Sequence, residues 1–259
     1  MQKMPVVFVW HGSPMNAIDD NTYTKSWKKI AESIPSPRAI LMFSAHWITS
    51  WETRISNQLQ PKMIYDMGGF PPELYEVKYE APGSPDVAQE IQSLLAQNNI
   101  RAILDNNRWF DHGVWSVLMR MFPDASVPVI CMSIDYNSSV ESLYQLWQSL
   151  RILRESWILI MGSGNIVHNL RAIDWSGNHV YDWALEFDKK VSDLIFMHNI
   201  QGLLDFKSWW NISRLAHPTF DHLLPIFPLF GATNSEDEVS FFTSEISMGS
   251  LSMRSILWS

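Results

Sequence analysis

Apolar runs that stop at a histidine set the pattern of this chain. Residues 6–10 are apolar and are followed by His11, and residues 39–45 lead in the same way to His46. A third run, residues 157–161, passes through a Gly-Ser-Gly-Asn turn to His168. Such runs, rich in β-branched and aromatic residues and bounded by turn formers, are typical of buried strands. Because open α/β sheets keep ligands at the carboxyl ends of their strands, we expect three imidazoles at one edge.

The first half of the chain alternates between strand-like and helix-like patterns. The pattern predicts helices over residues 23–34, 85–97 and 139–155, and one that follows a turn at Gly113 and ends at Met121. It predicts further strands over residues 51–56, 100–104 and 127–134. This alternation favours an α/β fold. We expect a single domain over residues 1–259, with a mostly parallel or mixed central sheet covered by helices on both faces.

The second half holds helices and a strand-like tail. We expect helices over residues 181–197 and near 203–210, then a proline-interrupted helix over 219–227 that turns His222 inward. Residues 238–243 and 250–258 alternate like antiparallel edge strands. Earlier in the chain, residues 60–85 form a long irregular segment rich in aromatics and turn formers, and loops of this length are more often functional than not.

Composition narrows the class of protein. The chain has 46% hydrophobic and 18% charged residues, which suits a globular protein with a large core. Its net charge of −8 and its lack of a Lys/Arg cluster argue against a nucleic-acid partner. The apolar runs are too short and too interrupted by proline to span a membrane. The single cysteine, Cys131, excludes an intramolecular disulfide, so we expect a cytoplasmic protein.

Five of the eight histidines lie beside a turn or a strand end: His11, His46, His112, His168 and His222. One such histidine alone is more often a hydrogen-bonded side chain than a ligand. Several at strand ends favour a metal site, because neutral imidazole binds zinc and ferrous iron well. The chain has no compact HExxH or CxxC motif, which leaves the metal open. Gly162-Ser163-Gly164 lacks the third glycine of a dinucleotide motif, so no nucleotide cofactor is expected.

Six motifs together resemble a known family. They are His11-Gly12-Ser13-Pro14-Met15, Ser44-Ala45-His46-Trp47, Gly68-Gly69-Phe70-Pro71, Asp111-His112-Gly113, the segment from Gly162 to Leu170, and Met248-Gly249-Ser250-Leu251-Ser252-Met253. In this order they resemble the DODA-type extradiol aromatic ring-opening dioxygenases of the class III, LigB-like superfamily, and most closely its bacterial members. The resemblance covers essentially the whole chain.

The resemblance implies a metal site and a reaction. His11, His46 and His222 would bind one divalent metal, Fe²⁺ for dioxygenase activity or Zn²⁺. His168 would be an additional ligand or an acid–base residue. The late ligand is His222 where facial-triad oxygenases have a carboxylate. The neighbouring Asp221 is expected on another helix face and is not assigned a role.

The implied substrates are a DOPA-like catechol and O₂. We assign His168 as the base that removes a catechol proton and His112 as a proton donor, with Ser13, Tyr65 and Phe70 at the substrate pocket. Two other readings stay open. The same imidazoles could activate water in a zinc hydrolase, and the superfamily also resembles the non-catalytic Memo proteins.

Overall fold

A six-stranded mixed sheet forms the centre of the protein, with the strand order β6-β2-β8-β1-β12-β9. The computed structural model describes residues 3–259, apart from the side chains of Val140 and Trp210. The strands of this sheet are β1 (Val6–Trp10), β2 (Ala39–Ser44), β6 (Val129–Cys131), β8 (Ile158–Gly164), β9 (Val239–Phe242) and β12 (Ser255–Trp258). Four of them, β6, β2, β8 and β1, run parallel. The last two are antiparallel, β12 to β1 and β9 to β12.

Three two-stranded pairs accompany the central sheet. They are β3 (Ile48–Thr49) with β7 (Ile134–Asp135), β4 (Thr53–Ser56) with β5 (Ala102–Asp105), and β10 (Ile246–Ser247) with β11 (Leu251–Ser252). The strand expected over residues 127–134 is therefore two short strands, β6 and β7. The tail also differs from the prediction. Of the two tail strands in the central sheet, β9 lies at an edge and β12 does not, because β12 inserts between β1 and β9.

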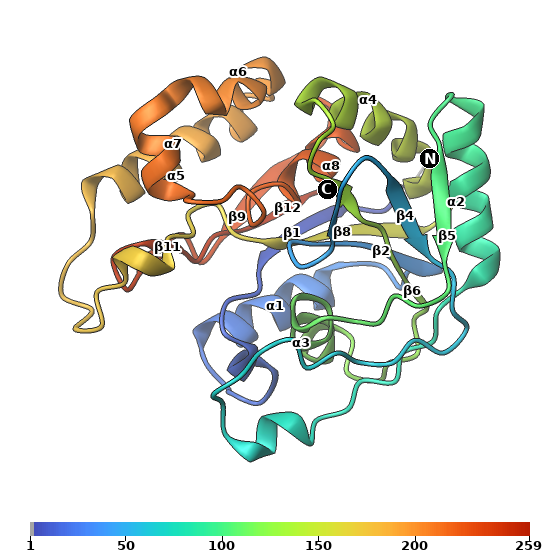
Figure 1. Cartoon of the computed structure of the whole chain (residues 1–259), viewed down its shortest axis with the longest axis horizontal. Coiled ribbons are helices and arrows are strands. Elements are labelled where there is room, and N and C mark those ends of the chain that lie inside the picture. Colours follow the sequence, from blue (N-terminus) through green and yellow to red (C-terminus); the bar gives the residue numbers. More distant parts are fainter. Residues whose placement is uncertain (1–2) are drawn as a thin grey trace.

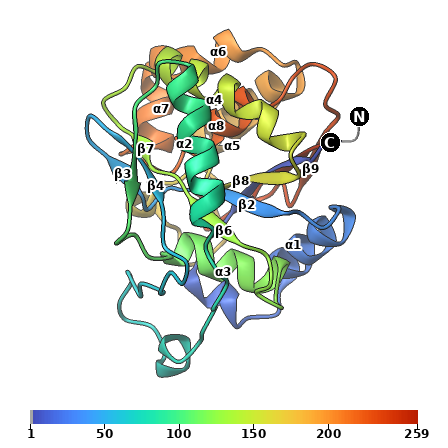
Figure 2. The ribbon, with the colours of Figure 1, turned by 90° about the vertical axis from the view of Figure 1, so that its right-hand side faces the viewer.

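Helices cover both faces of the sheet, as the sequence predicts. The α-helices are α1 (Thr22–Ser33), α2 (Pro85–Gln97), α3 (His112–Met121), α4 (Val140–Leu150), α5 (Asp182–Phe196), α6 (Ile200–Leu204), α7 (Trp210–Ala216) and α8 (Ile226–Gly231). Short 3₁₀ helices span Pro14–Ala17, Pro72–Tyr75, Arg151–Arg154, Leu170–Ala172 and Asp205–Trp209. Figure 1 shows α1 and α3 below the sheet and α4 and α8 above it, and the turned view of Figure 2 keeps this separation.

The alternation of side chains along each strand produces two hydrophobic cores. Val6 and Phe8 of β1 belong to the core under α2, α4, α5 and α8, whereas Val7 and Val9 belong to the core with α1 and α3. All four side chains are fully buried. A strand that is buried on both faces consists almost entirely of apolar residues. This is why the sequence predicts β1 and β2 clearly.

Two local predictions were wrong. Residues 219–225 form turns rather than a helix, and α8 begins only after Pro225, which has no N–H to donate inside a helix. Gly113 lies in the first turn of α3 rather than in a preceding turn. Among residues 3–259, no helix is long and apolar enough to cross a bilayer.

Candidate metal centre

Three parallel strands end side by side and carry histidines to one edge of the sheet. Both β1 and β2 pair with β8 up to its last residues, Ser163 and Gly164. His11 follows β1 directly, His46 lies two residues beyond β2, and His168 lies four residues beyond β8. The register of the parallel sheet thus brings together residues that are more than 150 positions apart in the chain.

His11, His46 and His222 form one compact group, which we call the histidine trio. One ring nitrogen of each lies within 4.8 Å of those of the other two, and the Nε2 atoms of His11 and His46 are 3.2 Å apart. Ring centroids in the trio are 5.0 to 5.3 Å apart. His222 lies in the turns that precede α8, and it is buried, as His11 is.

Two further side chains fix the orientation of the trio. Ser163 Oγ lies 2.8 Å from His11 Nδ1, and Asp221 Oδ2 accepts a hydrogen bond from His222 Nδ1 at 2.5 Å. Each contact occupies Nδ1 and leaves Nε2 for a ligand, the arrangement that metal-binding histidines commonly show. The sequence pattern gave Asp221 no role at the site, because it predicted a helix that would turn Asp221 away from His222. In the observed turns, adjacent residues are free to face each other.

Burial keeps three imidazoles at this edge neutral, those of His11, His46 and His168. Burial, with the neighbouring histidines, lowers the pKa of His11 well below its usual value. The same causes, burial first and then His112 and His222, lower the pKa of His46 to about 3. Burial and His222 also lower the pKa of His168. Neutral rings offer lone pairs, and this is the form in which histidine binds metals.

A second group, next to the trio, consists of His46, Asp66 and His112. Asp66 Oδ1 accepts hydrogen bonds from the backbone N–H of His112 at 2.9 Å and from its Nδ1 at 3.0 Å. Burial raises the pKa of Asp66, but the hydrogen bonds and charge of His112 outweigh this effect and lower it to about 2. The sequence analysis did not identify Asp66. Its only signal was its position in the long loop over residues 60–85.

His168 contacts the trio, but its ring nitrogens do not converge with those of the trio. Its ring stacks on that of His222 with centroids 3.6 Å apart and planes 8° apart. The backbone N–H of His168 donates to the carbonyl of Ala216 at 2.9 Å, which ties the segment after β8 to the end of α7. Among the described residues, His168 is in neither of the two groups whose ligand atoms converge.

Two glycines allow the close packing of these segments. A Cβ at Gly164 would lie 2.3 Å from the carbonyl oxygen of His222, so only glycine lets that segment approach the end of β8. A Cβ at Gly113 would lie 2.8 Å from Ser44 Oγ and 3.1 Å from the ring of His46. Gly113 therefore lets the start of α3 pack against the end of β2, which places His112 beside His46.

A buried carboxylate joins the same two elements. Asp111 is 1% exposed, accepts a hydrogen bond from Ser44 Oγ at 2.7 Å and forms an ion pair with Arg108. Burial raises the pKa of Asp111 despite the opposing charge of Arg108. The Asp111 side chain makes no capping hydrogen bond to α3, although Asp111 directly precedes that helix. It acts as a structural link beneath the histidines.

The three residues expected at the substrate pocket contact residues other than the histidines. Ser13 is exposed and accepts a hydrogen bond from the backbone N–H of Met15. Tyr65 donates to the carbonyl of Val77 at 2.7 Å and lines a cavity of about 530 Å³. Phe70 packs on the core that the sheet forms with α1 and α3. Among the described residues, none of these three makes a hydrogen bond or ring contact with the five histidines, and their pocket role stays a prediction.

The trio fits a divalent metal. Two ring nitrogens 3.2 Å apart, both on rings that burial keeps neutral, direct lone pairs into one small volume, and a cation there would bind both. Three imidazoles are a ligand set used by catalytic zinc, and imidazole also suits ferrous iron.

Comparisons with known proteins found a family model and several relatives that match most of this chain. A family model described as the catalytic LigB subunit of aromatic ring-opening dioxygenase matches residues 5–252. The chain is 39% identical to an Escherichia coli protein named 4,5-DOPA dioxygenase extradiol, over 98% of this chain and 94% of that protein. It is 35% identical to a protein of the same name from Beta vulgaris, over 90% and 88%. A crystal structure of an uncharacterized Escherichia coli K12 protein superposes with a TM-score of 0.85 at 35% identity, covering 99% of this chain and all of that one.

Proposed function

Since this chain belongs to the LigB family of aromatic ring-opening dioxygenases, we propose that it is an extradiol dioxygenase acting on a DOPA-like catechol. The observation that carries the proposal is the convergence of three histidines, His11 and His222 buried and His46 partly exposed, at the carboxyl edge of the parallel strands. Ring opening would add both atoms of O₂ to the catechol. One ring C–C bond and the O–O bond break, and the ring carbons are oxidised while O₂ is reduced.

His11, His46 and His222 would hold the metal in this proposal. Bound Fe²⁺ would supply a Lewis acid for the catechol oxygens and a redox-active centre between catechol and O₂. The protein supplies the orientation. Ser163 and Asp221 hold two of the three rings by their Nδ1 atoms, so little reorganisation is needed when a ligand binds.

Two histidines outside the trio would move protons. Burial keeps His168 neutral, so a ring nitrogen is free to accept the proton of a catechol hydroxyl. His112 donates its Nδ1 hydrogen to Asp66, and the carboxylate would stabilise an imidazolium there. A protonated His112 can then deliver a proton as the O–O bond breaks. The alternative role of His168 is that of a further metal ligand. A His168→Ala variant that loses metal would assign this role to it.

Isotope labelling tests the proposed reaction. Iron-loaded protein incubated with DOPA under ¹⁸O₂ should yield a yellow semialdehyde that carries both labelled atoms. The position of the label and of the new aldehyde, read by mass spectrometry and NMR, identifies the bond that breaks. A product with no label would rule out a dioxygenase reaction.

A zinc hydrolase is the second candidate. The convergent trio contains no carboxylate, unlike the two-histidine, one-carboxylate set of many iron oxygenases, and three histidines can hold a zinc-activated water. This reading predicts that the zinc-loaded protein hydrolyses esters or amides and that the His11→Ala variant does not.

A further inference from the structure

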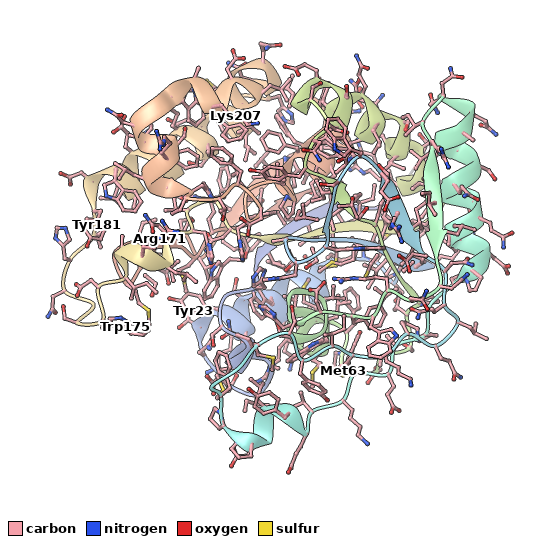
Figure 3. All side chains as sticks on the ribbon, viewed as in Figure 1. Tyr23, Met63, Arg171, Trp175, Tyr181 and Lys207 are labelled. Carbon is pink, nitrogen blue, oxygen red and sulfur yellow. The ribbon has the colours of Figure 1, made fainter. Side chains whose placement is uncertain are left out.

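A cationic cavity lies beside the segments that carry the histidines. Its volume is about 560 Å³, and its lining includes Arg171, Lys207 and Arg214 but no Asp or Glu. Arg171 lies in the 3₁₀ helix after β8, Lys207 in the one before α7, and Arg214 in the last turn of α7. Figure 3 labels Arg171 on the yellow segment and Lys207 on the orange one. We call this cavity the anion pocket. Three cations without a lining carboxylate are notable in a chain of net charge −8.

The three cations of the anion pocket have no carboxylate partner in the part of the chain that the structure describes. Among the described residues, none of these three side chains forms an ion pair or a hydrogen bond, whereas Arg154 and Arg254 are both paired with aspartates. Lys207 Nζ instead lies 5.7 Å from the ring centroid of Phe220, which also lines the pocket. The three cations can therefore bind an anionic group, and Phe220 can contact an apolar part of the same ligand.

His217 adds a second, independent feature. It lines the pocket, is 1% exposed, and its Nε2 lies 2.7 Å from the carbonyl oxygen of Ile166. A carbonyl can only accept, so Nε2 carries the hydrogen, and burial lowers the pKa of His217 to about 4, which keeps the ring neutral. Nδ1 is therefore a lone-pair acceptor, and it is buried without a partner among the described residues. Such atoms are costly unless a ligand or water satisfies them.

These features specify one kind of ligand. We propose that the anion pocket binds a small organic carboxylate with a hydroxyl or ammonium donor on the adjacent carbon. The carboxylate would face Arg171, Lys207 and Arg214, the donor would reach His217 Nδ1, and the apolar body would lie on Phe220.

The pocket shares one segment of chain with His168 and another with His222 of the trio. Asn169, in the pocket lining, directly follows His168, and His217 begins the segment that ends at His222. The bound carboxylate therefore has two sources, the side chain of the catechol substrate or a separate hydroxy or amino acid. The first source rests on the proposed function, whereas the pocket itself does not.

Calorimetry on metal-free protein tests the pocket without turnover. The probes are L-3-phenyllactate, which has both groups, 3-phenylpropionate, which lacks the donor, and 2-phenylethanol, which lacks the carboxylate. We expect phenyllactate to bind best. A Lys207→Gln/Arg214→Gln double variant should bind it at least about tenfold more weakly, since it loses two charged donors, and hydrogen bonds to charged groups are stronger than those between neutral groups. Both side chains are exposed, so the fold should be kept.

A matched control and two outcomes decide the proposal. Lys29→Gln, which removes an exposed cation on α1, should leave phenyllactate binding unchanged. Equal binding of phenyllactate by the double variant and the native protein would overturn the proposal. So would binding of 2-phenylethanol as tight as that of phenyllactate.

Kinetics of the iron-loaded protein separate the two sources. If the carboxylate belongs to the substrate, the double variant should raise KM for DOPA and leave KM for 4-methylcatechol unchanged. If it belongs to a separate ligand, neither KM changes while phenyllactate binding is still lost. Absence of turnover with every catechol would contradict the proposed function, and the binding result would still decide the pocket.

Discussion

Asp221 should control how tightly the trio binds a metal. Its carboxylate makes a hydrogen bond of 2.5 Å to His222 Nδ1, and its side chain is 29% exposed. Burial raises the pKa of Asp221, but the hydrogen bond and charge of His222 outweigh this effect, and the net pKa is lowered. The group is therefore an anion at neutral pH, and it makes the imidazole a better donor to a cation.

Two substitutions remove this contribution to different extents. Loss of a carboxylate behind a ligating histidine typically weakens metal binding by about 10–100-fold, or about 1.4–2.8 kcal/mol. Asp221→Asn keeps an oxygen that can accept from His222, and the partial exposure admits water, so we expect a loss near the lower limit. Asp221→Ala leaves no acceptor, and we expect a loss near the upper limit.

Competition with a chromophoric chelator measures Zn²⁺ affinity for these variants. Asp193→Asn is the control, because it removes an exposed carboxylate whose partner is Lys189 and should not change zinc affinity. Native affinity in both Asp221 variants would refute the reasoning and would leave Asp221 as a surface charge only.

The remaining predictions concern the histidines. Replacing His11 or His46 by Ala should abolish metal retention in folded protein, whereas full metal content by elemental analysis in both variants would place the metal elsewhere. His112→Gln should lower kcat by about 10²–10⁴-fold with little change in KM, and near-native turnover would exclude it from the mechanism. Burial lowers the pKa of His11, His46, His168 and His217, so the unfolded chain takes up protons first as pH falls below 6.5. The free energy of unfolding of metal-free protein should fall by about 1 kcal/mol per histidine from pH 6.5 to 5.5, and urea midpoints that do not move would contradict this.

The histidines at the carboxyl edge of the sheet were predictable, because each strand that ends there is recognisable from its own residues. The strands before His11 and His46 are buried on both faces, so they read as uninterrupted apolar runs that stop at turn formers. Parallel strands that enter one sheet bring their carboxyl ends together whatever lies between them in sequence. The histidines and the α/β fold could therefore be derived without knowledge of the strand order.

The supporting residues depend on contacts that the sequence pattern does not encode. Asp66 lies in an irregular segment, and only the tertiary fold brings it to His112, 46 positions later. The expected helix over residues 219–227 would place Asp221 and His222 on different faces. The structure has turns at these two residues, and in the turns Asp221 contacts His222. The place of β12 inside the sheet likewise depends on pairing across almost the whole chain, Val6 with Trp258.

Dioxygen consumption by matched iron-loaded and zinc-loaded samples tests the central claim most directly. Zinc has no accessible redox chemistry, so both forms should bind DOPA but only the iron form should consume O₂, one molecule for each yellow product formed. Catechol binding by the iron form without O₂ uptake, together with ester hydrolysis by the zinc form, would contradict the account.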